Sequence, residues 1–117
     1  MTADEMRAEL LESDSRLRGL LMLKLRLERR AREAKAGMNG VKEEIVQDVS
    51  KNPEDYGFPL GARVGRALAV ATAMSSSECS SRGEELRRMV DRIMRVNVEL
   101  DVLKARMENL RCVLASL

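Results

Sequence analysis

The chain has 117 residues, which suits a single domain, and 44% of them are hydrophobic while only 2% are aromatic. Any core must therefore be aliphatic, and a hydrophobic share this high excludes a disordered chain. Charged residues make up 34% with a net charge of +2, a composition typical of long helices and coiled coils.

The small net charge conceals an uneven distribution along the chain. Residues 3–14 hold five acidic residues against the single base Arg7, a local net charge of −4. Residues 15–42 hold nine basic residues against Glu28 and Glu33, a local net charge of +7. The following stretch to Asp55 is acidic again. This asymmetry indicates that the basic segment is the part of the chain suited to an anionic partner.

Several classes of protein are excluded by what the sequence lacks. There is no histidine, and Cys79 and Cys112 form no CxxC pair, which argues against a zinc site and for two reduced thiols. No secretory leader pattern is present, and no stretch approaches the roughly 18 apolar residues of a membrane span. We expect a protein of the cytoplasm with no membrane contact and no cofactor.

A long first helix is predicted from about residue 3 to residue 50. Thr2 followed three residues later by Glu5 is a capping-box pattern for its first turn. Hydrophobic residues then recur at steps of three or four residues, which draws one apolar stripe along a helix. The stripe consists of Leu17, Leu20, Leu23, Leu27, Ala34, Met38, Val41 and Ile45.

Two places in this first helix predict irregularity. The run Ser13–Ser15 predicts a kink or a restart, because short polar side chains compete for backbone hydrogen bonds. Gly37 and Gly40 flank Asn39, and each glycine inside a helix costs about 1 kcal/mol relative to alanine, so we expect a hinge near Asn39.

A loop is predicted at residues 51–61, where KNPEDYGFPLG contains both prolines of the chain. The alanine-rich residues 62–74 that follow suit a short helix or an extended crossover, and we favour the helix. Tyr56 and Phe58 in the loop are the only aromatic residues. They suit a hydrophobic anchor that ties the loop to the helices, or a stacking surface for bases.

The last helix is predicted at about residues 77–116, with the preceding serines able to cap it. Taking Leu86 as position a, five unbroken heptads carry hydrophobic residues at every a and d position, the signature of a coiled-coil seam. These helix-packing or oligomer residues are Leu86, Met89, Ile93, Val96, Leu100, Leu103, Met107, Leu110, Leu114 and Leu117.

Valines outside this seam widen the apolar surface beyond what a two-stranded coil requires. They stand at positions 90, 98, 102 and 113. We therefore predict an all-α fold with one helical domain over residues 1–117. Its long helical hairpin, with the C-terminal heptad-repeat helix, is expected to assemble as a helical bundle or ring homo-oligomer.

The sequence does not favour an enzyme. It lacks histidine, a GxSxG motif, a phosphate-binding glycine loop and any acidic cluster with metal-loop spacing. The neighbouring carboxylates Glu43 and Glu44 diverge by about 100° on a helix, as do Glu84 and Glu85, so neither pair shares a site. They are most simply solvated faces.

The basic run KLRLERRAREAK is the best candidate for a binding site. Its positive charges on one helix predict a ridge that neutralises phosphates of a nucleic acid, without reading its sequence. The alternatives are a solvated face with intrahelical pairs such as Glu28 to Arg32, and a membrane surface beside Leu20–Leu27. The predicted nucleic-acid-binding residues here are Lys24, Arg26, Arg29, Arg30, Arg32, Lys35 and Lys42.

The order of features resembles the small bacteriophage recombination mediator proteins of the UvsY type. A first helix with a basic C-terminal half is followed by a loop, the small-residue segment GRALAVATAMSSS and a long last helix. The likeness covers most of the chain, and the segment from Val98 to Leu110, VELDVLKARMENL, is most similar to the family's C-terminal helix. The near-absence of aromatic residues and the Asn52–Pro59 loop depart from the family.

The resemblance implies a helical ring that binds single-stranded DNA and helps load a strand-exchange recombinase while displacing single-strand-binding protein. It implies DNA contacts at Arg63 and Arg66 in addition to the basic residues of 24–42, with assembly through the last helix. The alternative is a coiled-coil scaffold, adaptor or chaperone-like assembly protein whose basic residues serve solubility or a protein partner.

Overall fold

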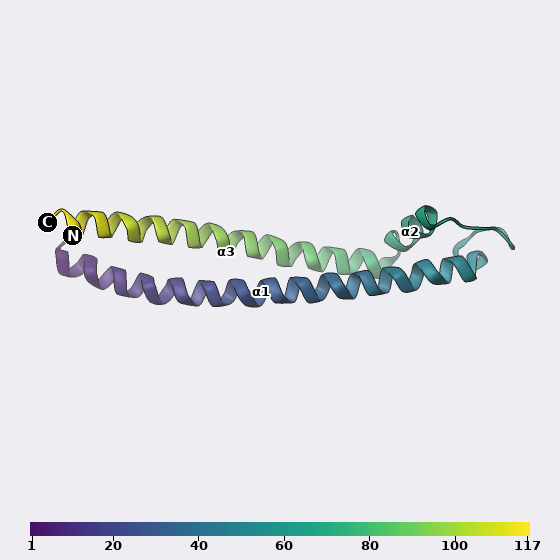
Figure 1. Ribbon diagram of the computed structural model, residues 1–117, viewed down its shortest axis with the longest axis horizontal. Helices are drawn as coiled ribbons and strands as arrows, with labels where there is room; N and C mark the ends of the chain where they lie inside the picture. Colours follow the sequence, from purple (N-terminus) through teal and green to yellow (C-terminus); the bar gives the residue numbers. More distant parts are fainter. The chain divides into compact units, whose positions relative to one another are not determined.

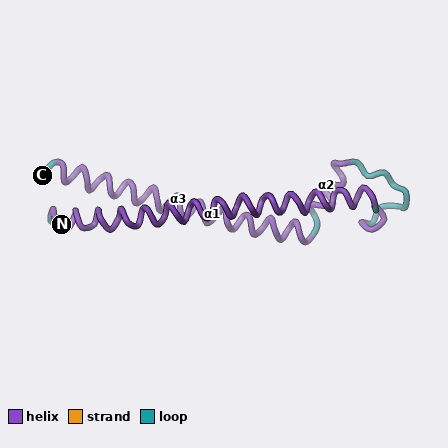
Figure 2. The backbone as a smooth tube through the Cα atoms, turned by 60° about the horizontal axis from the view of Figure 1, so that its bottom comes forward, coloured by secondary structure: helices purple, strands orange, loops and turns teal.

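The computed structural model describes residues 1–117 and contains three α-helices, one short 3-10 helix and no strand (Figures 1 and 2). The all-α prediction is therefore confirmed. In chain order the elements are α1 (Ala3–Lys51), η1 (Pro53–Tyr56), α2 (Arg66–Met74) and α3 (Ser77–Ala115). None of the helices combines the length and the apolar character that a membrane span requires.

The chain forms two compact units, and α1 and α3 each contribute to both. Unit 1 consists of Met1–Arg29 and Val90–Leu117, and unit 2 consists of Arg30–Met89. Each unit has a hydrophobic core of its own.

Helix α1 begins where the capping pattern predicts. The backbone N–H of Glu5 donates to the Thr2 side-chain oxygen at 3.2 Å, which satisfies one of the free donors of the first turn. The restart expected at Ser13–Ser15 is wrong, because α1 is continuous there. Ser13 is buried at 8% exposure in the stripe that packs on α3, so its small side chain serves helix contact rather than a break.

Unit 1 is an antiparallel pair of helical segments with the two chain termini close together (Figures 1 and 2). Leu27, Val96 and Leu100 form its buried cluster. Residues packed against this cluster are Leu17, Leu20, Leu23 and Ile93. Removing a side chain of this size from water contributes about 1.5–3 kcal/mol, so this aliphatic seam is the main source of stability in unit 1.

The a and d residues of α3 are buried or half-buried, with one exception. The buried ones are Val96, Leu100, Met107 and Leu110. The half-buried ones are Leu86, Met89, Ile93, Leu103 and Leu114. Leu117 lies after the end of α3 and is 77% exposed. In unit 1 these residues pack on α1 of the same chain, so covering them does not require a second chain.

Unit 2 has a core made largely of small side chains. Ala69 and Ala73 of α2 are completely buried against Val46 and Val49 of α1. Partly buried residues complete this core: Ile45, Tyr56, Phe58, Val64 and Val70. Alanine at the contact lets two helix backbones approach closely, which is how the short α2 reaches α1.

Glycine serves close approach on α1 as well. A Cβ built on Gly37 lies only 3.3 Å from Nη1 of Arg82, so the glycine leaves room for that guanidinium. Helix α1 is continuous through Gly37 and Gly40, where a hinge was expected.

Helix α2 begins at Arg66, four residues later than predicted. Gly61 has a left-handed backbone (φ 79°) and Gly65 at the N-cap is extended, so residues 62–65 continue the loop. Helix α3 begins as predicted, because the Ser76 hydroxyl accepts a hydrogen bond from the Cys79 N–H at 3.2 Å.

Candidate nucleic-acid interface

The predicted basic residues fall in both units. Lys24, Arg26 and Arg29 belong to unit 1. Arg30, Arg32, Lys35, Lys42, Arg63 and Arg66 belong to unit 2. The positive charge of the basic run is therefore carried by α1 in both units.

Exposed basic residues of α1 differ in whether a carboxylate neutralises them. Arg7, Arg16 and Arg18, in the first third of the helix, each form an ion pair. Four exposed bases of residues 24–42 have no such partner: Arg26, Arg30, Arg32 and Lys35. An exposed cation without a local counter-charge retains its full positive potential for an external anion.

The remaining predicted residues are less available. Lys24 is half-buried and contacts Glu28 at 3.9 Å, so Glu28 pairs with Lys24 rather than with Arg32. Lys42 is half-buried, and Arg29 is engaged in an interaction of its own. Arg63 is exposed.

Arg66 is held by a carboxylate of α1. Its guanidinium donates to both oxygens of Glu43, with the shorter contact at 2.8 Å. This hydrogen bond, more than the charge of the guanidinium, lowers the pKa of Glu43 below its ordinary value. Arg66 therefore joins α2 to α1 in unit 2, a structural role that the resemblance does not imply.

Helix α3 contributes two further bases that were not predicted from the sequence. Arg92 and Arg95 are exposed and form no ion pair. At about 100° per residue they lie within 40° of Glu99 around α3, on the side where Glu99 contacts Arg16 of α1. Arg92 stands seven residues before Glu99 and fourteen before Arg106, which both pair with α1, but Arg92 itself has no such partner.

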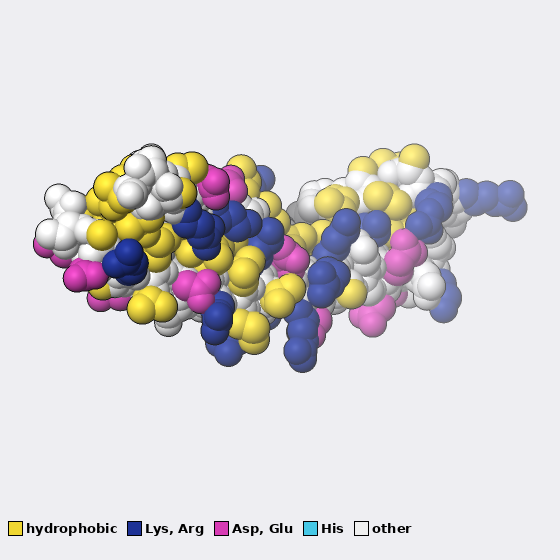
Figure 3. All heavy atoms as spheres, turned by 60° about the vertical axis from the view of Figure 1, so that its left-hand side comes forward, with side chains coloured by type: hydrophobic (Ala, Val, Ile, Leu, Met, Phe, Trp, Pro, Cys, Tyr) yellow, Lys and Arg dark blue, Asp and Glu magenta, His cyan; other side chains and the backbone are white.

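On α1, Arg26 lies about 80° around the helix from Arg16. We call Arg26, Arg92 and Arg95 the basic flank of unit 1. Figure 3 shows Lys and Arg side chains at the surface beside hydrophobic ones.

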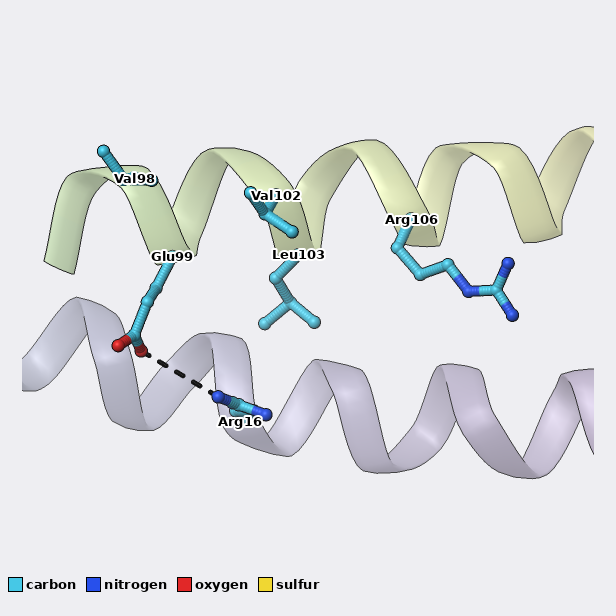
Figure 4. Close-up of a pocket in the computed structure, with 6 residues that line it drawn as sticks. All are labelled: Arg16, Val98, Glu99, Val102, Leu103 and Arg106. Atoms are coloured by element: carbon cyan, nitrogen blue, oxygen red, sulfur yellow. Dashed lines mark ion pairs between the residues drawn. The ribbon is translucent and has the colours of Figure 1, made fainter. Parts of the chain in front are cut away.

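An open groove of about 260 Å³ lies on this side of unit 1 (Figure 4). Val98, Val102 and Leu103 provide its apolar wall. Arg16 crosses it to Glu99 at 3.9 Å, and Arg106 makes a two-point contact with Glu9, at 3.0 and 3.2 Å. The groove offers an apolar wall edged by guanidinium groups, with neither a nucleophile nor an acid–base pair.

The loop aromatics belong to the core of unit 2. Tyr56 and Phe58 pack against its buried cluster, which confirms the hydrophobic-anchor interpretation. The Tyr56 hydroxyl donates to Asp48 at 2.5 Å, and Asn52 donates to the same carboxylate. The Tyr56 hydrogen bond is the main cause that lowers the pKa of Asp48, and it raises the pKa of Tyr56. Neither ring is a free stacking surface, so a nucleic acid would be held by charge.

The other chemistry-bearing groups form no site. Cys79 is buried, Cys112 is exposed, and both are free thiols. No three acidic or cysteine side chains gather closely enough to hold a metal ion. Comparisons with protein families, with curated proteins and with solved structures give no match for this chain.

Proposed function

We propose that this chain is a non-enzymatic accessory protein that binds single-stranded DNA without sequence preference. By analogy with the UvsY-type mediators that the sequence resembles, it acts as a homo-oligomer that helps load a strand-exchange recombinase in competition with single-strand-binding protein. Oligomerisation strengthens binding, because several weak sites joined in one particle act at a high effective concentration.

The observation that supports DNA binding most is the change in pairing along α1. Bases in its first third are matched by carboxylates, whereas Arg26, Arg30, Arg32 and Lys35 are exposed and unmatched. Arg92 and Arg95 add two further unmatched charges in unit 1. Such residues gain most from phosphate, because binding releases counterions without first breaking an ion pair.

The test is fluorescence anisotropy of a labelled single-stranded oligonucleotide at several salt concentrations. The variant Arg26→Gln, Arg30→Gln, Arg32→Gln removes three unmatched charges while keeping good helix formers. We expect weaker binding and a log–log salt dependence shallower by about 2, since each phosphate contact to a single strand contributes about 0.7.

A matched control removes three exposed bases that are already paired: Arg7→Gln, Arg18→Gln, Arg111→Gln. It has the same change in net charge and is expected to retain most of the affinity. Equal losses in both variants would indicate a general charge effect and no defined interface. Absence of binding by the wild-type chain at low salt would refute the proposal.

A coiled-coil scaffold or adaptor is the second candidate, and the engagement of Tyr56 and Phe58 in the core of unit 2 favours it. Without free aromatic rings the chain lacks the stacking contacts common in single-strand binders. A chain that does not bind the oligonucleotide but forms a stable assembly would support this candidate.

A further inference from the structure

Unit 1 carries exposed hydrophobic side chains on both of its helices outside the buried seam. On α1, Leu21 is 39% exposed and Leu25 is 60% exposed. On α3, Val90 is 43% exposed and Met94 is 60% exposed. We call these four residues the apolar patch. None of them belongs to the buried cluster or to the groove of Figure 4.

The interhelical ion pairs show that the four residues form two pairs, each at one level along the helices and one turn apart. Glu9 with Arg106 and Arg16 with Glu99 both have residue numbers that add to 115, which sets the antiparallel register. Leu21 with Met94 and Leu25 with Val90 also add to 115. The two helices therefore present these side chains as one surface rather than as scattered residues.

The apolar patch faces away from the ion pairs. At about 100° per residue, Leu21 and Leu25 lie 140° or more around α1 from Arg16. Val90 and Met94 lie 140° or more around α3 from Glu99. At the level of the patch, the basic flank and the ion pairs therefore lie on one side of unit 1 and the four hydrophobic side chains lie on the other.

The apolar area around the patch is close to that of a homodimer interface. Met22 adjoins Leu25 on α1 and is 53% exposed. Together with the patch it presents on the order of 450 Å² of apolar surface, within the range that a monomer leaves uncovered. A standard interface buries about 800 Å² per partner, and about 65% of a homodimer interface is apolar, so each partner contributes about 500 Å² of apolar surface.

We propose that the apolar patch is where a second copy of this chain docks. Two copies related by a two-fold axis bury Leu21, Leu25, Val90 and Met94 against the same residues of the other copy, as an isologous contact requires. The two helical pairs then form a four-helix bundle, and the basic flank stays open in both copies. This inference rests on the assembly part of the proposed function and is independent of its DNA-binding part.

The test measures the mass of the full chain by light scattering and sedimentation over a dilution series, without nucleic acid. The wild type is expected to have twice the chain mass and to dissociate on dilution. The variant Leu25→Lys, Met94→Lys places like charges in the contact and is expected to weaken dimerisation by about 100-fold or more.

The matched control is Ala8→Lys, Val102→Lys, which changes one residue on each helix by the same charge. Ala8 and Val102 are exposed and lie on the side of the ion pairs, about 80° from Arg16 and about 60° from Glu99, so this variant is expected to remain a dimer. Circular dichroism checks that the helices persist. The uncharged variant Met94→Gln is measured alongside, with an expected weakening of about 10-fold, in case the lysine pair unfolds.

A wild-type chain that stays monomeric at every concentration overturns the proposal and leaves a different protein as the occupant. An oligomer that neither patch variant weakens, or that the control weakens as much, overturns it too. Failure of DNA binding with an intact dimer would count only against the DNA part of the proposed function.

Discussion

The two units pack their helices together with side chains of different size. Unit 1 fills the space between its helices with long aliphatic residues such as Leu27 and Leu100. Unit 2 brings a third helix close with Ala69 and Ala73, both completely buried. A seam of leucines is destabilised when a side chain is made smaller, whereas a contact made by alanines is destabilised when a side chain is made larger. The two units should therefore respond differently to the same kind of substitution.

The largest effect is expected in the unit 1 seam. Leu100 is 2% exposed, and Leu100→Asp replaces its packing with an unpaired charge in the core. Loss of the leucine alone costs about 2–5 kcal/mol, and the buried charge adds to this, so unit 1 is expected to unfold. Circular dichroism during urea unfolding measures the change. Val102→Asp, at a 65% exposed position two residues away, is the control and should change the midpoint little.

The unit 2 contact is expected to show the opposite sensitivity. Ala73→Leu inserts three carbon atoms where α2 has no free space, and such overpacking typically costs about 1–3 kcal/mol. Ala71→Leu, on the exposed side of the same helix, is the control and should be neutral. If thermal unfolding shows both variants at the wild-type midpoint, the close approach of α2 to α1 is wrong.

A smaller, pH-dependent effect is expected at the anchor of the unit 2 loop. The pKa of Asp48 is lowered from its ordinary value of 3.8 and that of Tyr56 is raised from 10.0, each mainly by their shared hydrogen bond. A lowered carboxyl pKa contributes stability above pH 3.8 that is lost as pH falls through the folded value. A raised tyrosine pKa contributes stability below pH 10.0 that is lost as pH rises through the folded value.

Tyr56→Phe should therefore destabilise the protein at pH 7 and approach the wild type in strong acid. Urea unfolding of both proteins at pH 7 and pH 2 measures the difference. A gap that stays the same at the two pH values would contradict the role of the Asp48 hydrogen bond.

The smallest effects are expected at the exposed ion pairs, where the two units should behave alike. Arg106 holds Glu9 in unit 1, and Arg66 holds Glu43 in unit 2. Both pairs are solvent-accessible, so salt screens them. Double-mutant cycles with glutamine at each position should show weak coupling at low salt that disappears at high salt. Coupling that survives high salt in one unit only would reveal a difference in burial.

The helices, their caps and their buried faces could be predicted from the sequence, because they depend on the spacing of residue types along a single helix. The heptad pattern predicted the burial of Leu100 and Met107, and Thr2 and Ser76 were predictable as caps. The restart predicted from the serines at 13–15 was wrong, because burying a continuous hydrophobic stripe outweighs the tendency of these side chains to hydrogen-bond to the local backbone. The start of α2 was missed because Gly65 permits either conformation.

Contacts between residues far apart in the chain could not be predicted from the sequence. The sequence identified the bases of α1, but it gave no sign that Glu43 would hold Arg66, 23 residues away. Nor did the heptads say which helix would cover the seam. In unit 1 it is α1 of the same chain, which moves the surface available for assembly from the a and d residues to the apolar patch. These facts depend on the register between helices, which only the folded chain sets.

The adjacency of the two termini in unit 1 has a mechanical consequence (Figure 1). A force applied between the first and last residues pulls α1 and α3 apart sideways, so their contacts break one turn after another. Met107 and Leu110, near the termini, would lose their contacts with the other helix before Val96 and Leu27 do. Unit 1 should therefore yield at low tension when held by its ends, and resist far more when the same helices are pulled along their length.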